Sequence, residues 1–351
     1  MSNRTTSWRE QLRRSIVCLD DLPLPKHKMR TLANVVKKYP MRIPRHLAEI
    51  IDWNDPRCPI KRQVLPSEAE LDDLGCTDPL DEERFKVAPG VIRRFDDRLL
   101  ALVHHTCPIL CRHCNRKRTW LTPLVPAGAE EIAKALSKSN HIKEVILSGG
   151  EPLLLSDKSL DSLLCAARSK PGVQVLRVHS RAPVSLPSRI TPALVNMLKS
   201  HDPLWFVTHF NTHKELSAQS RRALAVLRSA GIPVLNQAVL LRGVNDSTRA
   251  LAALGRALVS AGVKPYYLFQ LDMATGTTHF QVPLRRGLEI VSRLQRNHSG
   301  LLVPRYMADL PGRGGKVELS PEVIVKWTDK GAILRGADGK KVLYEDKFKR
   351  K

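Results

Sequence analysis

The stretch RLLALVHHTCPILCRHCNRKR, residues 98–118, joins an apolar run to three closely spaced cysteines. The run is short and rich in leucine and valine, which is typical of a buried strand. In α/β proteins the segments that follow the strands carry the binding and catalytic groups. The CxxxCxxC spacing of Cys107, Cys111 and Cys114 therefore indicates a reactive or metal-binding site at the end of a strand.

Similar apolar runs recur along the chain, and amphipathic helical patterns separate them. The further runs are KEVILSGG (143–150), VQVLRVHS (173–180), LWFVTHFN (204–211), IPVLNQAVLL (232–241) and PYYLFQLD (265–272). The helical patterns include GAEEIAKALSKS (128–139), DKSLDSLLCAARSK (157–170) and STRALAALGRALVSAG (247–262). Strands that alternate with helices imply parallel βα units. We therefore predict an α/β fold with a partial (βα)6 TIM-like barrel over residues 91–300.

The two ends of the chain differ from this pattern. Residues 1–90 are rich in proline and charge and contain short helical patterns, so they predict a mostly helical N-terminal segment. Residues 301–351 form a short C-terminal extension, and within it the sequence PGRGGK (311–316) delivers a lysine from a glycine-rich turn.

Composition limits the classes of protein to be considered. The 351 residues are 42% hydrophobic, which is enough for a core, and no apolar run has membrane-spanning length. Seven cysteines, an odd number with four of them scattered, do not form a disulfide framework, so we expect a reducing, cytoplasmic compartment. The net charge of +23 is typical of polyanion binding, but no aromatic-interleaved RNA-binding motif accompanies it. Nucleic acid is thus the less favoured partner.

The cysteine cluster allows two interpretations. A structural zinc site needs four ligands, usually in two pairs, and the candidates for the fourth are His104, His105, His113 and Cys165. None of these has paired spacing. Three thiolates on one loop instead suit an iron–sulfur cluster with one iron left open. The spacing resembles that of the radical S-adenosylmethionine (SAM) enzymes, in which SAM chelates the open iron.

A second motif supports this resemblance. The sequence VILSGGEPLL places Gly149, Gly150 and Glu151 at the end of the next predicted strand. Glycines let the backbone approach a ligand closely, and an acid accepts hydrogen bonds from an ammonium group. An ordinary Gly-Gly turn is the alternative, but the motif is similar to the GGE segment that contacts the SAM amino group in that superfamily.

Further blocks resemble one family within the radical SAM enzymes, the pyridoxal phosphate (PLP)-dependent lysine 2,3-aminomutases. These blocks are NDPRCPIKRQVLPSEAEL, CRHCNRKR, LSGGEPLLLSD, SRAPVSLPSRITPALVNMLK, THFN, NQAVLLRGVND, PYYLFQLD and SGLLVPRYMADLPGRGGK. They cover nearly the whole chain in one order. The resemblance implies a cytoplasmic isomerase that uses a [4Fe–4S] cluster, SAM and PLP to move the α-amino group of L-lysine to Cβ.

The resemblance also implies roles for individual residues. The cluster would be held by Cys107, Cys111 and Cys114. SAM would be surrounded by Gly149, Gly150, Glu151, Ser180, His209 and Gln237.

For PLP, the resemblance implies a Schiff base with Lys316 and a phosphate site made by Arg94 and Arg98. Without it, Lys316 would read as a solvated loop lysine and the arginines as a basic surface turn. Arg116 would pair with the substrate α-carboxylate. Asp272 and Asp309 would bind the distal ammonium.

Departures from the family pattern bear on metals and partners. The family's longer members carry a cysteine after the VND block and others beyond the lysine, and these bind zinc. Ser247 stands at the first position and the second group is missing, so we expect no zinc. The same departures leave it open whether the chain forms the family's usual homo-oligomer. An electron donor of the flavodoxin or ferredoxin type is the implied protein partner.

Substrate choice depends on electrostatics. Two carboxylates in a closed site disfavour a neutral or acidic side chain, because unpaired buried charge is costly. Lysine is therefore expected ahead of arginine. A lysine attached to elongation factor P is a further alternative, because a related branch of the family modifies it. From another class, a basic zinc-knuckle nucleic-acid-binding protein is the rival interpretation.

Overall fold

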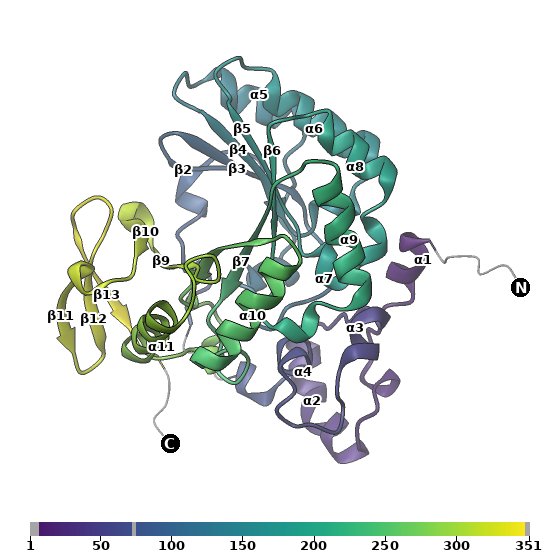
Figure 1. The fold of residues 1–351 in the computed structure, drawn as a ribbon, viewed down its shortest axis with the longest axis vertical. Coiled ribbons are helices and arrows are strands. Elements are labelled where there is room, and N and C mark those ends of the chain that lie inside the picture. Colours follow the sequence, from purple (N-terminus) through teal and green to yellow (C-terminus); the bar gives the residue numbers. More distant parts are fainter. Residues whose placement is uncertain (1–6, 72–74, 348–351) are drawn as a thin grey trace, which may run out of the picture.

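A ten-stranded sheet lies at the centre of the structure, a computed structural model that describes residues 7–71 and 75–347. Its strands neighbour one another in sequence order (Figure 1). They are β1 (Lys86–Ala88), β2 (Val91–Phe95), β3 (Arg98–His104), β4 (Glu144–Gly149), β5 (Val175–His179), β6 (Leu204–Thr208), β7 (Val234–Val239), β8 (Lys264–Phe269), β9 (Arg305–Leu310) and β10 (Gly315–Glu318).

Strands β3 to β9 pair in parallel, and antiparallel strands flank them at both edges. Parallel neighbours need a crossover, and helices supply it. These are α5 (Ala129–Ser137), α6 (Asp157–Arg168), α7 (Ala182–Ser185) with α8 (Pro192–Lys199), α9 (Ala218–Ser229), α10 (Thr248–Ser260) and α11 (Leu284–Asn297). The six apolar runs of the sequence coincide with β3 to β8. Among the described residues the sheet stays open, since β1 and β10 each have one neighbour.

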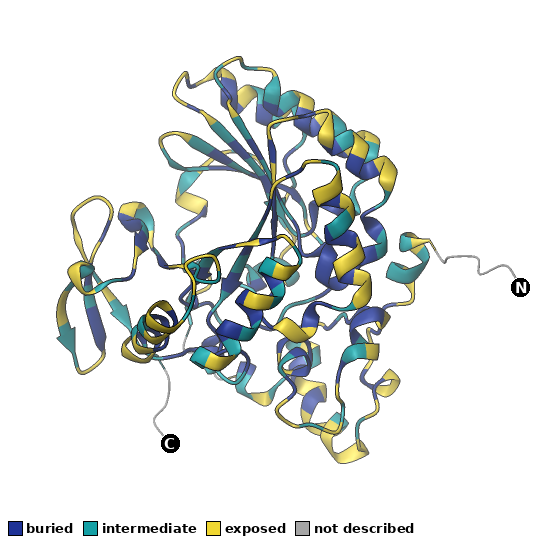
Figure 2. Cartoon of the chain, in the orientation of Figure 1, coloured by how far each residue is buried: buried dark blue, intermediate teal, exposed yellow. Residues whose placement is uncertain are grey.

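The helices form where the sequence provides caps and an apolar stripe. Ser156, Ser217 and Ser247 accept hydrogen bonds from the first turns of α6, α9 and α10. One face of each helix is buried against the sheet, as Leu160 and Leu164 of α6 are. Figure 2 shows buried residues concentrated in the strands and exposed ones on the outer helix faces. Ser247 therefore has a structural role as a helix cap.

The N-terminal segment contains α1 (Trp8–Arg13), α2 (Lys26–Lys38), α3 (Arg45–Ile50) and α4 (Pro59–Val64). Helices α3 and α4 pack near α7 and the turn before α9 (Figure 1). The segment continues into the loops that precede β1. Through these contacts it carries polar side chains, among them Gln63, Glu70 and Glu82, to the end of the sheet where the cysteines lie.

The C-terminal segment completes the sheet and adds a second one. Strands β9 and β10 form an antiparallel pair in which Asp309 is opposite Lys316. Gly312 and Gly315 have φ of 62° and 64°, a conformation that glycine adopts without strain, and they shape the turn between the strands. A three-stranded antiparallel sheet follows, made of β11 (Ile324–Thr328), β12 (Gly331–Arg335) and β13 (Lys341–Glu345).

The central sheet runs from Lys86 to Glu318 and so crosses both boundaries drawn from the sequence, at residues 90 and 300. The division 1–90, 91–300 and 301–351 stays a prediction. None of the helices in the described ranges combines the length and apolar character needed to cross a membrane.

Candidate active site

A cavity of about 330 Å³ opens at the carboxyl ends of the parallel strands, and nearly all of the predicted site residues line it. The lining includes Arg94, Arg98, Cys107, Cys111, Cys114, Arg116, Gly149, Gly150, Glu151, His209, Gln237, Asp272, Asp309 and Lys316. Ser180 is buried directly behind the wall, where its side chain bonds to Glu151. Residues predicted from separate parts of the sequence, between Arg94 and Lys316, thus meet in one place.

The cysteine loop leaves β3 and lies beside the glycine segment that follows β4. The backbone N–H of Gly150 donates to the carbonyl of His104 over 2.7 Å, and that of Glu151 donates to Thr106 over 2.8 Å. A Cβ at Gly150 would lie 2.2 Å from the Thr106 oxygen, so only glycine fits there. The close approach of the two loops explains why the residue after Gly149 is a second glycine.

The environment of the three thiols favours their binding to one shared cationic cluster. Burial raises the pKa of Cys107 well above its usual value, and the charges of Cys114 and Cys111 add to that rise. Burial, followed by the charge of Cys111, raises the pKa of Cys114 to about 11. Without a cation the thiolates repel one another, whereas bound metal keeps coordinating thiols deprotonated. The donor set therefore fits a cluster with three cysteine ligands.

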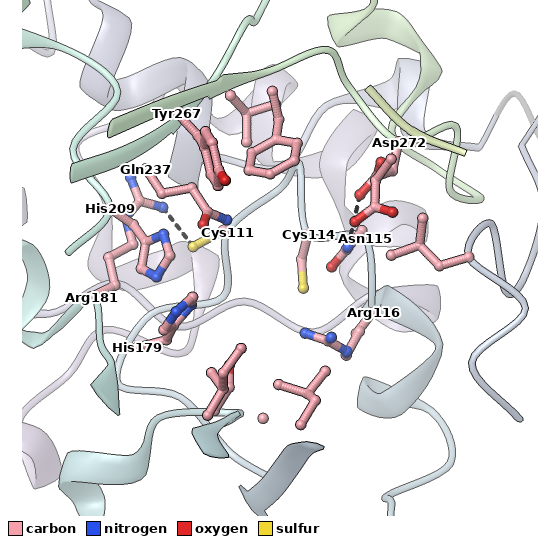
Figure 3. A pocket seen from close by; sticks show the side chains of 18 of the residues that line it. Cys111, Cys114, Asn115, Arg116, His179, Arg181, His209, Gln237, Tyr267 and Asp272 are labelled. Atoms are coloured by element: carbon pink, nitrogen blue, oxygen red, sulfur yellow. Dashed lines mark hydrogen bonds between the residues drawn. The ribbon is translucent and has the colours of Figure 1, made fainter. Parts of the chain in front are cut away.

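Arg181 is the principal residue of the cluster region that the sequence did not reveal. Its Nη1 donates to Cys111 Sγ over 2.6 Å (Figure 3). Its Nη2 donates to Glu215 and Gln63, each over 2.8 Å. The charges of Cys111 and Glu215 raise the pKa of Arg181 although burial alone would lower it. In the part of the chain that the structure describes, its Nε is buried and has no hydrogen-bond partner. Arg181 directly follows Ser180, a predicted SAM contact, but no motif or spacing in the sequence distinguished Arg181 itself.

Glu151 is held by the backbone at the end of β4. Its Oε2 accepts from the backbone N–H of Arg181 over 2.8 Å, and its Oε1 accepts from Leu153 over 3.1 Å. Burial nevertheless raises its pKa to about 7. Burial lowers the pKa of His209, which also lines the cavity, to about 4, so its imidazole is neutral at physiological pH. His209 and Gln237 lie on one wall of the cavity close to Cys111 (Figure 3).

At the opposite side of the cavity, Asp309 lies between two cations. It forms ion pairs with Lys316 of β10 and with Arg94 of β2. Burial alone would raise the pKa of Asp309, but Lys316 and Arg94 hold it below the ordinary value. The Lys316 Nζ also lies 5.0 Å from the centre of the Phe269 ring. In the structure Asp309 is thus a partner of the lysine as well as a candidate for substrate contact.

The two predicted phosphate arginines differ in how they are held. Arg94 Nε donates to the carbonyl of Gly312 over 2.9 Å, which ties β2 to the β9–β10 turn. Arg98 is 30% exposed, pairs with its neighbour Asp97 and stacks over Phe95 at 4.4 Å. Both line the cavity, and Arg98 has the freer guanidinium.

Asp272 is the second carboxylate of the cavity. Burial, followed by the negative charge of Asp309, raises its pKa to about 7. The side-chain amide of Asn115 donates to its Oδ2 over 2.8 Å (Figure 3). Asn115 therefore has a clear role next to the last cluster cysteine, although its sequence position gave no indication of one.

The basic residues after Cys114 are held by acids from the N-terminal segment. Arg116 pairs with Glu82 through two nitrogens, at 2.6 and 2.9 Å, and Arg118 reaches the same carboxylate over 2.9 Å. Although burial alone would raise it, Arg116 holds the pKa of Glu82 down at about 2. Lys117 is buried against Glu70 over 2.7 Å. This basic run therefore faces inward, which argues against the nucleic-acid interpretation.

Comparison with known proteins places the chain in a family. Residues 102–254 match the model of the radical SAM superfamily, and residues 291–348 match the lysine-2,3-aminomutase model. The chain is 38% identical to the L-lysine 2,3-aminomutase of Clostridium subterminale, over 97% of this chain and 84% of that protein. It is 40% identical to the Methanococcus maripaludis L-lysine 2,3-aminomutase, over 88% and 72%.

A relative with another substrate also matches. The glutamate 2,3-aminomutase of Clostridioides difficile is 33% identical over 97% of this chain and 82% of that protein. The superfamily match implies that the enzyme uses a [4Fe–4S] cluster and SAM. Identity of this level over nearly the full length shows that the chain belongs to the lysine 2,3-aminomutase family of radical SAM isomerases.

Proposed function

We propose that this enzyme moves the α-amino group of L-lysine to Cβ and gives β-lysine. When bound, the cluster with SAM supplies the radical that removes a hydrogen from Cβ, and PLP carries the migrating nitrogen. The observation that supports a cationic substrate most strongly is the pair of carboxylates, Asp272 and Asp309, in the same cavity as the cysteines and Lys316.

On the cluster side, we assign the iron ligands to Cys107, Cys111 and Cys114. The SAM contacts are assigned to the cavity wall made by Gly149, Gly150, Glu151, Ser180, His209 and Gln237. The glycines let the backbone approach the ligand, and the neutral His209 can donate or accept without bringing a charge. Bonds from two backbone N–H groups fix Glu151 in place to receive an ammonium group.

On the other side, Lys316 is the residue that holds PLP, and Arg94 and Arg98 bind its phosphate. The Lys316 amine lies on a strand rather than on a mobile loop, and its pairing with Asp309 fixes its direction. The guanidinium of Arg98 is well suited to phosphate, because it bonds to its neighbour Asp97, whereas Arg94 is tied to the β9–β10 turn through the Gly312 carbonyl.

The substrate would lie between these two regions. Arg116 would bind the α-carboxylate, and Glu82 holds its guanidinium plane in position. Asp272 and Asp309 would receive the distal ammonium. L-Glutamate, the substrate named for one relative, would place a third carboxylate beside them and is disfavoured by like-charge repulsion. L-Arginine carries the required positive charge and is the second candidate.

The open sheet would act as a partial barrel that shields the cavity. The reductant, a protein of the flavodoxin or ferredoxin type, would approach the cluster loop. We also propose that copies of the chain associate and that the enzyme works in the cytoplasm. A cavity closed by the N-terminal loops on one side and the β9–β10 pair on the other would protect a radical from water.

The lysine assignment can be tested by trapping. The protein is loaded with PLP, reduced with borohydride and digested, and the pyridoxyl group is located by mass spectrometry. We expect the pyridoxyl group on Lys316. The variant Lys316→Ala should lose both the pyridoxyl group and the aminomutase activity. Lys326→Ala, a change at an exposed lysine of β11, is the control and should keep both. A pyridoxyl group on another lysine, or its retention in Lys316→Ala, would contradict the assignment.

A further inference from the structure

Three side chains with metal-binding atoms lie together on the outer surface, away from the active-site cavity. Asp161 and Cys165 are one turn apart on α6, and His201 follows the end of α8. The carboxylate oxygen, the thiol sulfur and an imidazole nitrogen all lie within 4.8 Å of one another. None of the three lines the active-site cavity. Helices α6 and α8 are neighbours on the outer face of the sheet (Figure 1).

We propose that Asp161, Cys165 and His201 form a zinc site with a fourth position open to water. Thiolate, imidazole and carboxylate are the three ligand types that zinc takes in proteins. With zinc–ligand bonds of about 2.0–2.3 Å, tetrahedral ligands lie roughly 3.3–3.7 Å apart. In the structure the three ligand atoms lie within 4.8 Å of one another, and rotation of the exposed Asp161 and Cys165 side chains would bring them to this spacing. An acidic cluster alone would favour harder cations, but the thiol and the imidazole select zinc.

The backbone around these ligands is already fixed. The i and i+4 positions of Asp161 and Cys165 put both side chains on one face of α6. The Ser156 cap and the buried Leu160 and Leu164 hold that helix against the sheet.

The imidazole ligand is fixed from the other side. The His201 backbone N–H donates to Leu198, and its carbonyl accepts from Arg168 Nη2 over 3.0 Å. Its Nε2 lies 2.7 Å from Asp161 Oδ1, so the imidazole already faces the carboxylate. Little conformational entropy would therefore be lost when a metal binds.

Access and burial also suit a metal that comes from solvent. The side chain of Asp161 is 45% exposed and Cys165 is exposed, whereas His201 is 9% exposed. The metal would join α6, the crossover between β4 and β5, to the turn between α8 and β6. It would stabilise two successive crossovers of the sheet that carries the active site. The ligands are not those of the family's zinc segment, which would involve position 247 and residues beyond Lys316.

The test uses the enzyme with its iron–sulfur cluster loaded, so that Cys107, Cys111 and Cys114 are occupied. Zinc is removed with a chelator and titrated back, and binding is followed by elemental analysis and by zinc-edge X-ray absorption, which iron does not obscure. We expect one zinc per chain with one sulfur and two or three nitrogen or oxygen neighbours. Cys165→Ser and His201→Ala should each raise the Kd for zinc more than about 100-fold, since even loss of an outer-shell partner costs 10–100-fold.

The matched control is Cys18→Ser. Cys18 is another exposed cysteine whose thiol contacts an aspartate, Asp20, over 3.7 Å. Within residues 7–71 and 75–347, no histidine joins that pair to make a three-ligand group. Its zinc affinity should equal that of the wild type. Asp161→Asn, which keeps the shape of the side chain, provides a second variant if another change disturbs α6. Zinc that binds without a sulfur neighbour, or with the same affinity in Cys165→Ser and Asp161→Asn, overturns the proposal, as does failure to take up one equivalent.

Discussion

Asp272 carries the clearest functional signature of any single residue. Its pKa is raised to about 7, by burial first and by the negative charge of Asp309 second. A neutral carboxyl cannot attract an ammonium group strongly, so the residue must ionise before a cationic substrate binds well. The ion pair formed on binding would then stabilise the charged form. Binding of lysine should accordingly release a proton at pH values below about 7.

This property predicts a pH dependence of substrate binding. As the pH falls below about 7, the ionised fraction of Asp272 decreases about tenfold per pH unit, so the KM for L-lysine should rise in proportion. Above that pH the KM should be flat with respect to this group. Steady-state kinetics with the reconstituted enzyme between about pH 6 and 9 measure it.

The variant Asp272→Asn separates this residue from other titrating groups. It should lower kcat/KM for L-lysine by roughly 30- to 1000-fold, which corresponds to about 2–4 kcal/mol, and remove the rise in KM at low pH. Asp329→Asn, a change at an exposed aspartate in the turn after β11, should change neither. If the KM of Asp272→Asn rises at low pH as much as that of the wild type, another titrating group is responsible for the rise.

The residue scale also shows what sequence reasoning can recover. Cys107, Lys316 and Asp272 were identified because each stands in a recognisable motif. Glu82, Arg181 and Asn115 were missed, because each acts through a partner far away in the sequence. Glu82 is 34 positions from Arg116, and Asn115 is 157 from Asp272. No local spacing predicts such pairs.

At the scale of elements, a buried ionic cluster anchors the cysteine loop to the N-terminal segment. Glu70 binds Arg112, which lies next to Cys111, and also Lys117. All three side chains are at most 1% exposed. Removal of one member leaves uncompensated charge in the interior, which is more costly than loss of a surface pair.

Glu70→Ala should therefore lower the free energy of unfolding by about 3–5 kcal/mol and reduce the iron bound per chain. Chemical unfolding and iron analysis measure the two effects. Glu68→Ala, a change at the exposed glutamate in the same turn, should have little effect on either. If Glu70→Ala unfolds at the wild-type denaturant concentration and retains its iron, the anchoring role is wrong.

The sequence predicted the central strands of the sheet better than the strands at its C-terminal edge. The strands β3 to β8 were readable because buried parallel strands are short apolar runs between helical patterns. Strand β9 was missed as a strand, since RYMADL contains an arginine and an aspartate. The pairing that places Asp309 opposite Lys316 depends on the β9–β10 turn, and only the three-dimensional register reveals it.

At the scale of the whole molecule, the site is assembled from all three parts of the chain. The N-terminal segment contributes Glu82, the central strands contribute the cluster loop and Asp272, and the C-terminal segment contributes Lys316. The net charge of +23 did not indicate the function, because part of the basic content is internal. Arg112, between two of the cysteines, and Lys117, in the basic run after them, are both buried.

A cavity that rearranges a cationic amino acid should discriminate among substrates by the charge of their side chains. The reconstituted enzyme, with reductant, SAM and PLP, is given L-lysine, L-arginine and L-glutamate at equal concentration, and the β-amino acids are separated and identified by mass spectrometry. We expect β-lysine as the main product, β-arginine as a minor one and no β-glutamate. A predominance of β-glutamate, or no β-amino acid from a fully loaded enzyme, would contradict the account.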